Sequence, residues 1–198
     1  MKLNIKGLLL SAMLTCMAFL SLLYVSCKGK DGKSSPFKDQ CAAISCAYGG
    51  YCSEGKCVCP SGYEGDNCEL ITRDKFLSSW TVKETGTITV AREYAIAIEK
   101  DVATAPVNSV LVKLLYNYFS ISVRANVVKD SIFIPNQQIM GKIVFGKGYI
   151  YADTLGQPNG RISMRYEVVD SANNNIVDDF GYYEDVYHSK PSSWTKHN

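Results

Sequence analysis

The sequence predicts an all-β fold in which a small disulfide-rich module precedes an antiparallel β-barrel or sandwich. Three observations carry this prediction. Six of the eight cysteines lie between Cys41 and Cys68. After residue 70, several stretches alternate apolar and polar side chains with period two, which is typical of half-buried strands. After the N-terminal apolar run, no stretch of ten or more residues has the apolar period of a helix.

The N-terminus has the features of a bacterial export signal. Two lysines make a basic start, and residues 7–25 then run without a charged side chain. That length is close to the roughly 20 apolar residues that cross a bilayer. A basic start, an apolar middle and a small residue at the end form the secretory pattern. The run ends at Ser26-Cys27, and the polar stretch "KGKDGKSSP" follows at once.

This ending resembles the lipobox of bacterial lipoproteins, in which the leader is removed and the cysteine becomes an acylated N-terminus. Ser26 and Val25 fit the pattern, whereas Tyr24 stands where leucine is usual. The resemblance implies a signal peptide over residues 1–26 and lipidation of Cys27, palmitate included. It places the protein in the cell envelope, anchored by lipid to the outer membrane and facing the periplasm or the surface. An ordinary signal peptide and an uncleaved anchor are the alternatives.

The number of cysteines supports lipidation. Cys16 leaves with the leader, six cysteines can pair among themselves, and Cys27 is left over. An odd cysteine in an exported protein needs an explanation, and a thioether-linked diacylglycerol supplies one. A free or intermolecular thiol fits a position directly after an apolar run less well. Residues 27–38 contain Gly and Ser without hydrophobic periodicity, which predicts a flexible, lipid-anchored tether.

The six-cysteine block has the spacing C-x4-C-x5-C-x4-C-x-C-x8-C. Six cysteines alone leave fifteen connectivities open. Together with "YGGYC" and "CVCPSGYEGDNC", the spacing resembles an EGF-like module over residues 39–69. The resemblance implies three disulfides, namely Cys41–Cys52, Cys46–Cys57 and Cys59–Cys68. A module of this size cannot bury enough apolar surface to fold unaided, so disulfides replace the missing core.

Neither zinc nor calcium is expected in this module. Cys57 and Cys59 are too close together for the usual pair of zinc ligands. Some EGF-like modules bind calcium through acidic residues just before the first cysteine, but here only Asp39 is available. We therefore predict no metal and no cofactor.

Residues 70–198 are long enough for one domain, and their pattern predicts antiparallel strands. The clearest strand is "RISMRYEVV". Its expected inward residues are Ile162, Met164, Tyr166 and Val168, and its expected outward residues are Arg161, Ser163, Arg165 and Glu167. The stretch "EYAIAIEK" alternates in the same way. The stretch "SVRANVVKDSIFIP" predicts a hairpin that turns at Lys129-Asp130, with Pro135 ending its second arm.

The domain opens with "FLSSWTVKET", which resembles the G-x-W opening strand of lipocalin-like barrels. Trp80 takes the place of the tryptophan, and Ser78 stands where that motif has glycine. The whole layout is similar to a group of Gram-negative outer-membrane lipoproteins with a lipid cysteine, one EGF-like module and a lipocalin-like β-domain. This resemblance implies the architecture and brings no activity with it.

Three short matches predict modification sites. "DSI", "DTL" and "DSA" resemble the Asp-(Ser/Thr)-aliphatic motif that some Gram-negative bacteria O-glycosylate on exported proteins. The candidate acceptors are Ser131, Thr154 and Ser171, all at or near predicted turns. The alternative for Ser131 is that it simply starts a strand.

The sequence offers little that favours catalysis. Both histidines, His188 and His197, lie in the C-terminal tail, and no Gly-rich phosphate loop follows a strand. The stretch "DDFGYYEDVYH" interleaves acidic and aromatic residues from Asp178 to Tyr187. It would suit a cation site or a sugar-stacking face. The preferred interpretation is a solvated last strand whose tyrosines cover the barrel edge.

The charge balance excludes a general attraction to nucleic acid. The chain has 21 basic and 19 acidic residues, and removal of the two leader lysines makes the numbers equal. A neutral protein has no overall field that attracts phosphates.

We therefore expect a non-catalytic, lipid-anchored envelope protein whose EGF-like module spaces a β-domain that binds a protein or small-molecule ligand. The alternative is an envelope-associated hydrolase that acts on glycans or related material. The interior of the barrel distinguishes these hypotheses. A lined cavity would favour ligand binding inside, a packed core would favour binding at the surface, and an open cleft with paired carboxylates would favour the hydrolase.

Overall fold

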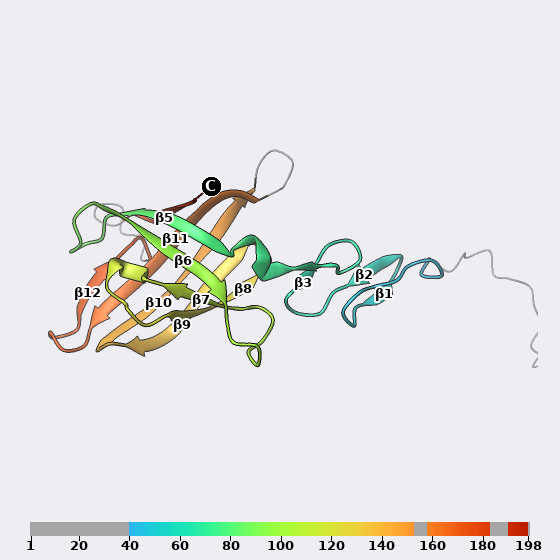
Figure 1. Cartoon of the computed structure of the whole chain (residues 1–198), viewed down its shortest axis with the longest axis horizontal. Helices are drawn as coiled ribbons and strands as arrows, with labels where there is room; N and C mark the ends of the chain where they lie inside the picture. The colour runs from blue at the N-terminus through green and yellow to red at the C-terminus, as the bar shows by residue number, and fades with distance from the viewer. Residues whose placement is uncertain (1–39, 153–157, 183–189, 198) are drawn as a thin grey trace, which may run out of the picture. The chain divides into compact units, whose positions relative to one another are not determined.

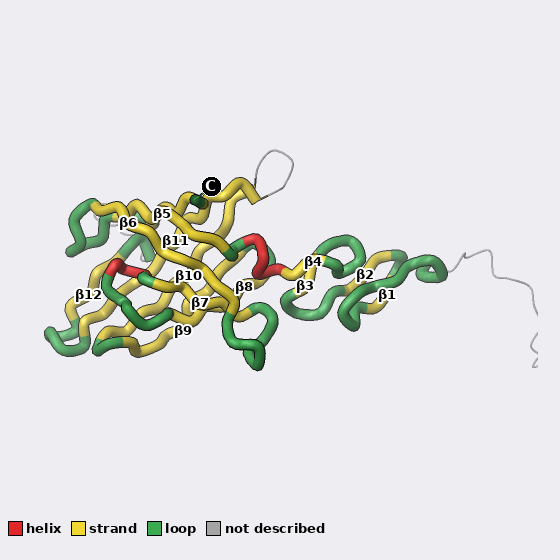
Figure 2. Tube along the Cα trace, in the orientation of Figure 1, coloured by secondary structure: helices red, strands yellow, loops and turns green. Residues whose placement is uncertain are grey.

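The computed structural model describes residues 40–152, 158–182 and 190–197 (Figure 1). From Cys41 onward the described residues belong to one compact unit. The predicted signal peptide, the lipidation site Cys27 and the tether lie outside the described residues. Figure 2 shows that strands dominate the described chain. The described residues also contain two short helical turns.

The disulfide-rich module consists of two small hairpins. The first pairs β1 (Tyr51–Ser53) with β2 (Lys56–Val58), and the second pairs β3 (Tyr63–Glu64) with β4 (Leu70–Ile71). Because β4 supplies the second arm of that hairpin, strand pairing in the module extends two residues beyond the predicted boundary at residue 69. The turn η1 (Thr72–Lys75) then leads into the β-domain.

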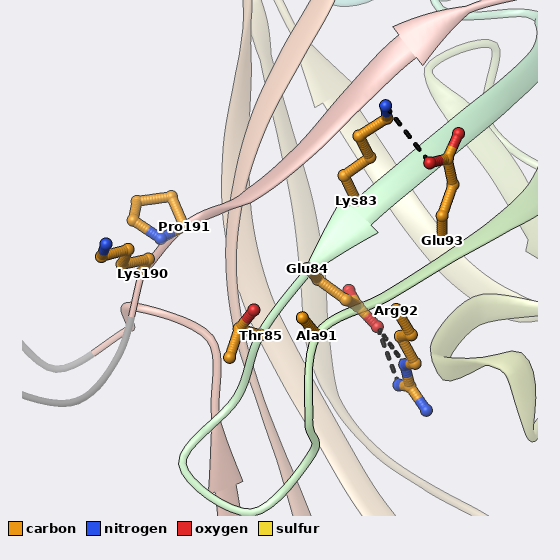
Figure 3. A pocket seen from close by; sticks show the side chains of 8 residues that line it. All are labelled: Lys83, Glu84, Thr85, Ala91, Arg92, Glu93, Lys190 and Pro191. Carbon is orange, nitrogen blue, oxygen red and sulfur yellow. Dashed lines mark hydrogen bonds and ion pairs between the residues drawn. The ribbon is translucent and has the colours of Figure 1, made fainter.

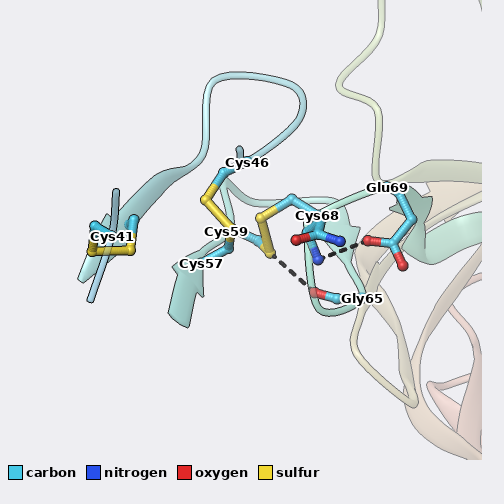
Figure 4. The surroundings of a disulfide bond; sticks show 9 residues. Cys41, Cys46, Cys57, Cys59, Gly65, Cys68 and Glu69 are labelled. Carbon is cyan, nitrogen blue, oxygen red and sulfur yellow. Dashed lines mark hydrogen bonds between the residues drawn. A yellow bond between two sulfur atoms is a disulfide. The ribbon is translucent and has the colours of Figure 1, made fainter. Parts of the chain in front are cut away.

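Three disulfides join Cys41 to Cys52, Cys46 to Cys57 and Cys59 to Cys68 (Figure 4). These are the pairs that the EGF-like resemblance implies. Gly50 of "YGGYC" lies where the backbone passes closest to two of them. A Cβ there would come within 2.8 Å of Cys68 Sγ and 3.1 Å of the Cys46 Cβ, so a larger residue does not fit without displacing the bridges.

The β-domain is an eight-stranded antiparallel barrel, which decides between the predicted barrel and sandwich. Consecutive strands pair as neighbours from β5 to β11, and β13 closes the ring between β11 and β5. The strands are β5 (Ser78–Glu84), β6 (Arg92–Lys100), β7 (Ser109–Lys113), β8 (Val123–Val128), β9 (Ser131–Ile139), β10 (Lys142–Ala152), β11 (Pro158–Asp170) and β13 (Ser192–Lys196). A short turn, η2 (Leu115–Asn117), lies between β7 and β8.

The longest strand, β11, divides one edge between two partners. Its residues 161–164 pair with β13, and its residues 167–170 pair with the extra strand β12 (Ile176–Asp179). Its other edge pairs with β10 along almost its whole length. The chain therefore leaves β11 through a hairpin and returns as β13 to complete the barrel.

The predicted alternation in β11 is confirmed. The four residues expected to face inward, Ile162, Met164, Tyr166 and Val168, are all at most 2% exposed. Two glycines of β10 lie directly opposite two of them, because Gly146 pairs with Tyr166 and Gly148 pairs with Met164. A Cβ at Gly148 would lie 2.6 Å from Met164 Sδ. Glycine thus leaves the space that the two larger side chains fill.

Both tryptophans are buried on the two strands that close the barrel. Trp80 of β5 is fully buried, and its indole N–H donates to the Phe76 carbonyl oxygen at 2.9 Å. Trp194 of β13 is also fully buried and donates to Ser192 Oγ at 2.9 Å. Each buried indole therefore has the partner that its N–H requires.

The prediction that Pro135 ends a strand is wrong, although the hairpin at Lys129-Asp130 is confirmed. Strand β9 continues to Ile139, with a register shift against β10 between its pairs at Ile134 and Gln137. Proline has no N–H to donate, so a bulge accommodates it within a strand. Beyond the bulge, the Gln137 side-chain amide bonds the backbone of Arg124, accepting from its N–H at 3.1 Å and donating to its carbonyl at 2.7 Å.

Glu167 faces outward, as predicted, but it is not open to solvent. Its register places it on the outer face of β11, yet only 5% of it is exposed. At this position β11 has a strand on each side, with Phe145 of β10 and Asp179 of β12 opposite. Tyr182, in the segment after β12, packs on Phe145 and bonds Asp179, so this segment covers the outer face beside Glu167.

Candidate functional site

Side chains fill the interior of the barrel. The buried apolar residues form one continuous cluster that draws on every strand of the ring, from Trp80 on β5 to Trp194 on β13. The interior is therefore a packed core, as in small barrels whose inward side chains occupy the whole space. The hollows of the β-domain lie at one end of the barrel and on its outer surface.

A buried carboxylate, Glu84, organises the end of the barrel where β5 and β6 meet. Glu84 Oε1 accepts from Arg92 Nη2 at 2.7 Å, Arg92 Nε at 3.0 Å and the Tyr94 hydroxyl at 2.8 Å. Glu84 Oε2 accepts from the Tyr166 hydroxyl at 2.7 Å and from Ser192 Oγ at 2.8 Å. Five donors from three strands besides its own thus satisfy the charge of this carboxylate. Such complete satisfaction is what a buried charge requires.

The two tyrosines in this network are held in their protonated form. Burial raises the pKa of Tyr94 and of Tyr166, and the neighbouring Glu84 carboxylate raises both further. Each phenol therefore remains a donor to Glu84 at neutral pH. The network braces the barrel end by joining β5, β6, β11 and β13.

A hollow of about 490 Å³ adjoins this network (Figure 3). Its lining residues are Lys83, Glu84, Thr85, Ala91, Arg92, Glu93, Lys190 and Pro191. Four of them form two ion pairs, Arg92 with Glu84 at 2.7 Å and Lys83 with Glu93 at 3.2 Å. The two carboxylates belong to opposite faces of the sheet, since Glu84 is buried with the core and Glu93 is exposed. Both line this hollow, but each is already engaged, Glu84 by its five donors and Glu93 by Lys83.

The acidic-aromatic segment differs from the predicted solvated strand. Asp178 is 3% exposed and accepts hydrogen bonds from the backbone N–H groups of Ile88 and Thr89, at 3.0 and 3.2 Å. It also accepts from the Thr89 hydroxyl and from the Tyr116 hydroxyl. The β5–β6 loop needs acceptors for its backbone donors, and Asp178 supplies them.

The neighbours of Asp178 are buried as well. Asp179 accepts from the Tyr182 backbone N–H at 2.7 Å, and Phe180 stacks on Tyr166 with ring centroids 4.5 Å apart. The remainder of the segment, including Tyr187, lies outside the described residues. Within the described part of the chain, no group of three or more His, Cys, Asp or Glu side chains could hold a metal ion.

The three candidate glycosylation acceptors have different surroundings. Ser171 is exposed in the turn after β11, which Asp170 stabilises by accepting from the Ala172 N–H at 3.2 Å. Ser131 is half-buried at the start of β9. Thr154 lies outside the described residues. Of the two acceptors that the structure describes, Ser171 is the one that combines exposure with a turn.

A groove of about 350 Å³ lies on the outer face of β9, β10 and β11, and we call it the outer groove. Its lining residues are Ser131, Phe133, Lys147, Gly148, Tyr149, Ser163 and Arg165. The strand register arranges them in two rows. Tyr149 lies between Ser131 and Ser163, and Lys147 lies between Phe133 and Arg165. Phe133 and Tyr149 are 42% and 45% exposed, so both rings are open to a ligand.

A second hollow of about 450 Å³ adjoins the outer groove and shares Ser163 with it. Its lining residues are Tyr151, Arg161, Ile162, Ser163, Pro191, Ser192 and Ser193. Tyr149 of the groove and Tyr151 of this hollow contact each other edge to face, with centroids 4.8 Å apart and hydroxyls at 3.0 Å. That hydrogen bond raises the pKa of Tyr149, so its phenol keeps its proton at neutral pH.

Sequence reasoning missed this site because it assigned the outward residues of each strand to solvent. A signal was present, since Phe133, Tyr149 and Tyr151 are aromatic at outward positions of their strands. They lie beside Lys147 and Arg165 because of the way in which β9, β10 and β11 pair. The apolar pattern of one strand does not show how that strand pairs with its neighbours.

Comparison with known proteins supplies no argument about this chain. No family model matches the chain. A solved protein of unknown function from Bacteroides ovatus is 12% identical, with a TM-score of 0.35. The match covers 62% of this chain and spans about two fifths of that protein, 42% of its length. A likeness of this size carries no argument about function. Among the described residues, no helix has the length and apolar character needed to cross a bilayer.

Proposed function

We propose that the protein is a non-catalytic, lipid-anchored binding protein of the cell envelope that holds a glycan on the outer face of its barrel. The EGF-like module acts as a cross-linked spacer between the lipid on Cys27 and the β-domain. The observation that carries the proposal is the contrast between the two faces of β10. Its inward side faces a filled core, whereas its outward side forms a hollow between exposed aromatic rings and cations.

The packed interior argues against a ligand inside the barrel. Gly146 and Gly148 are in contact with Tyr166 and Met164, so the space that they release is already occupied. At one end, the Glu84 network joins β5, β6, β11 and β13. The outer hollows of about 350 and 450 Å³ have the size at which small-ligand sites begin.

The chemistry of the outer groove favours a sugar. An exposed aromatic ring offers an apolar face with a polar edge, which suits the apolar C–H face of a sugar ring. Ser131 and Ser163 place hydroxyls on both sides of Tyr149, where they can bond sugar hydroxyls. The groove is open to solvent and includes the cations Lys147 and Arg165, unlike the desolvated apolar pockets that anchor protein partners.

The alternative hydrolase finds less support. Glycoside hydrolysis needs two carboxyl groups on either side of one bond. Glu84 and Glu93 lie on opposite faces of their strands, and Asp178 is engaged by four donors. Glu84 cannot accept a further hydrogen bond from an attacking water, because five donors already surround its two oxygens.

Contacts around Lys75 support the role of the module as a spacer. Its ammonium group lies 2.8 Å from Glu64 in β3 and 2.7 Å from Asp130 in the β8–β9 turn. A cation that bonds both segments restrains their separation. All six cysteines of the module are in disulfides, which cross-link the spacer.

Retention on immobilised polysaccharides tests the proposed function. The mature protein in detergent is passed over agarose that carries dextran, laminarin, alginate or polygalacturonate. We expect retention on at least one matrix, and we expect Phe133→Ala with Tyr149→Ala to abolish it while leaving the melting temperature near that of the wild type. Tyr51→Ala removes an aromatic ring in the module that is 63% exposed, and it serves as the control. No retention on any matrix, or equal retention by the double variant, would refute the proposal.

A further inference from the structure

The geometry points to a linear acidic polysaccharide as the ligand, lying along β10 and placing successive anionic sugars in the outer groove and in the second hollow. This inference rests on the proposed function and adds the charge and the chain length of the glycan. It is carried by a repeat in the two hollows, each of which combines one tyrosine with one arginine.

The repeat follows the strand register. Tyr149 and Arg165 line the outer groove, and Tyr151 and Arg161 line the second hollow. The two tyrosines are two residues apart on β10, which separates them by about 7 Å along the strand. Ser163 belongs to both hollows, so the two adjoin at this residue. A ligand that repeats along its length matches two adjoining hollows that each hold one tyrosine and one arginine better than one compact molecule does.

The charge of this surface favours an anion. Lys147 pairs across the strands with Arg165, and Arg161 follows two rows further along β11. A guanidinium carries five donors in a planar fork, so it can bond a sugar carboxylate or sulfate while it keeps bonds within the protein. Two acidic residues that the structure describes near these rows are engaged or covered. Asp130 is paired with Lys75, and Glu167 is buried.

The arrangement of the rings favours a glycan over a single-stranded nucleic acid. Nucleic acids bind to aromatic platforms on which successive bases stack. Here the planes of Tyr149 and Tyr151 are crossed at 63° and their hydroxyls are bonded to each other. Crossed rings do not continue a base stack, whereas each can contact a separate sugar. The neutral charge of the mature chain also supplies no general attraction to phosphates.

Calorimetric titration of the mature protein in detergent tests the inference. The probes are galacturonate oligomers of two and six sugars, a neutral glucose hexamer and a single-stranded thymidine oligonucleotide. We expect the galacturonate hexamer to bind at least tenfold more tightly than the dimer and than the neutral hexamer. Lys147→Gln in the outer groove and Arg161→Gln in the second hollow should each weaken hexamer binding at least fivefold. Lys56→Gln, an exposed change in the module, should leave it unchanged.

The outcomes separate this inference from the proposed function. Equal binding of neutral and acidic hexamers, still lost in the Phe133 and Tyr149 double variant, would overturn the acidic ligand and leave glycan binding intact. Equal affinity for the dimer and the hexamer would overturn the linear ligand that occupies both hollows. Tighter binding of the oligonucleotide would overturn the glycan itself, and binding of no probe would contradict both proposals. Melting temperatures of the variants near that of the wild type show that the changes act on binding.

Discussion

Gly146 of β10 lies directly opposite Tyr166 of β11, and a Cβ at Gly146 would come within 2.4 Å of the Tyr166 Cβ. Tyr166 therefore fits at its position only because Gly146 has no side chain. Tyr166 in turn donates to Glu84 and stacks on Phe180. The glycine, the ring and the carboxylate therefore form one packed unit in the barrel.

This relationship predicts the effect of Gly146→Ala. The added methyl group meets main-chain and Cβ atoms that cannot turn away, so overpacking should cost about 1–3 kcal/mol in the free energy of unfolding. Lys147→Ala, on the exposed side of the same strand, should stay within about 0.5 kcal/mol. Urea denaturation of both variants measures the difference. Equal midpoints would show that the interior has room to spare.

A second prediction concerns Met164, which is fully buried beside Gly148. Truncation to alanine in a packed core costs about 2–5 kcal/mol, and Met164→Ala should lower the melting temperature accordingly. The neighbouring Arg165→Ala should change it far less, because its side chain lies on the outer face. A small loss at Met164 combined with weaker ligand binding would indicate a cavity in place of a core.

A third prediction follows from the buried phenols. Tyr94 has a pKa raised above its ordinary value of 10.0, first by burial and then by Glu84. The folded state therefore holds this proton more tightly than the unfolded state does. The resulting stability is complete below about pH 10 and declines as the pH rises above it.

Tyr94→Phe should flatten this alkaline decline. At neutral pH it should also cost about 1–2 kcal/mol, because Glu84 loses one donor. Urea midpoints between pH 8 and pH 11 measure both effects, with the exposed Tyr51→Phe as the control. The same slope in Tyr94→Phe and the wild type would show that this phenol does not govern alkaline unfolding.

A fourth prediction tests the anchor. Cys27→Ala in the native host should move the protein from the membrane fraction to the soluble fraction. The mature chain should also lose the mass of a diacylglycerol and its amide-linked acyl group, which intact-mass spectrometry detects. Membrane association that persists in this variant would contradict lipidation as the means of attachment.

Much of the fold could be predicted from the sequence, because the cysteine spacing and the alternation of apolar side chains are local patterns. The cysteine spacing of the module and the alternation in β11 each lie within one short stretch. The inward position of Glu84 was also accessible, since it continues the alternation of Trp80 and Val82. Its donors Arg92 and Tyr94 lie just across the β5–β6 hairpin.

The rest depends on contacts between distant segments. Ser192 reaches Glu84 only because β13 returns to close the barrel, 108 residues along the chain. Asp178 is buried because a loop 89 and 90 residues before it presents unsatisfied backbone donors. The outer groove requires the register of three strands at once. These pairings are set by the whole fold, so no single stretch of sequence contained them.

The central claim is that the ligand lies on the outer face of the barrel and not inside it. Fluorine NMR of mature protein labelled with 3-fluorotyrosine tests this directly, with resonances assigned by single Tyr→Phe variants and the galacturonate hexamer as the titrant. We predict that the resonances of Tyr149 and Tyr151 shift on titration, while those of the half-buried Tyr94 and the buried Tyr166 stay in place. Movement of Tyr94 and Tyr166 with Tyr149 and Tyr151 unchanged, or no movement at all at saturating hexamer, would contradict the account.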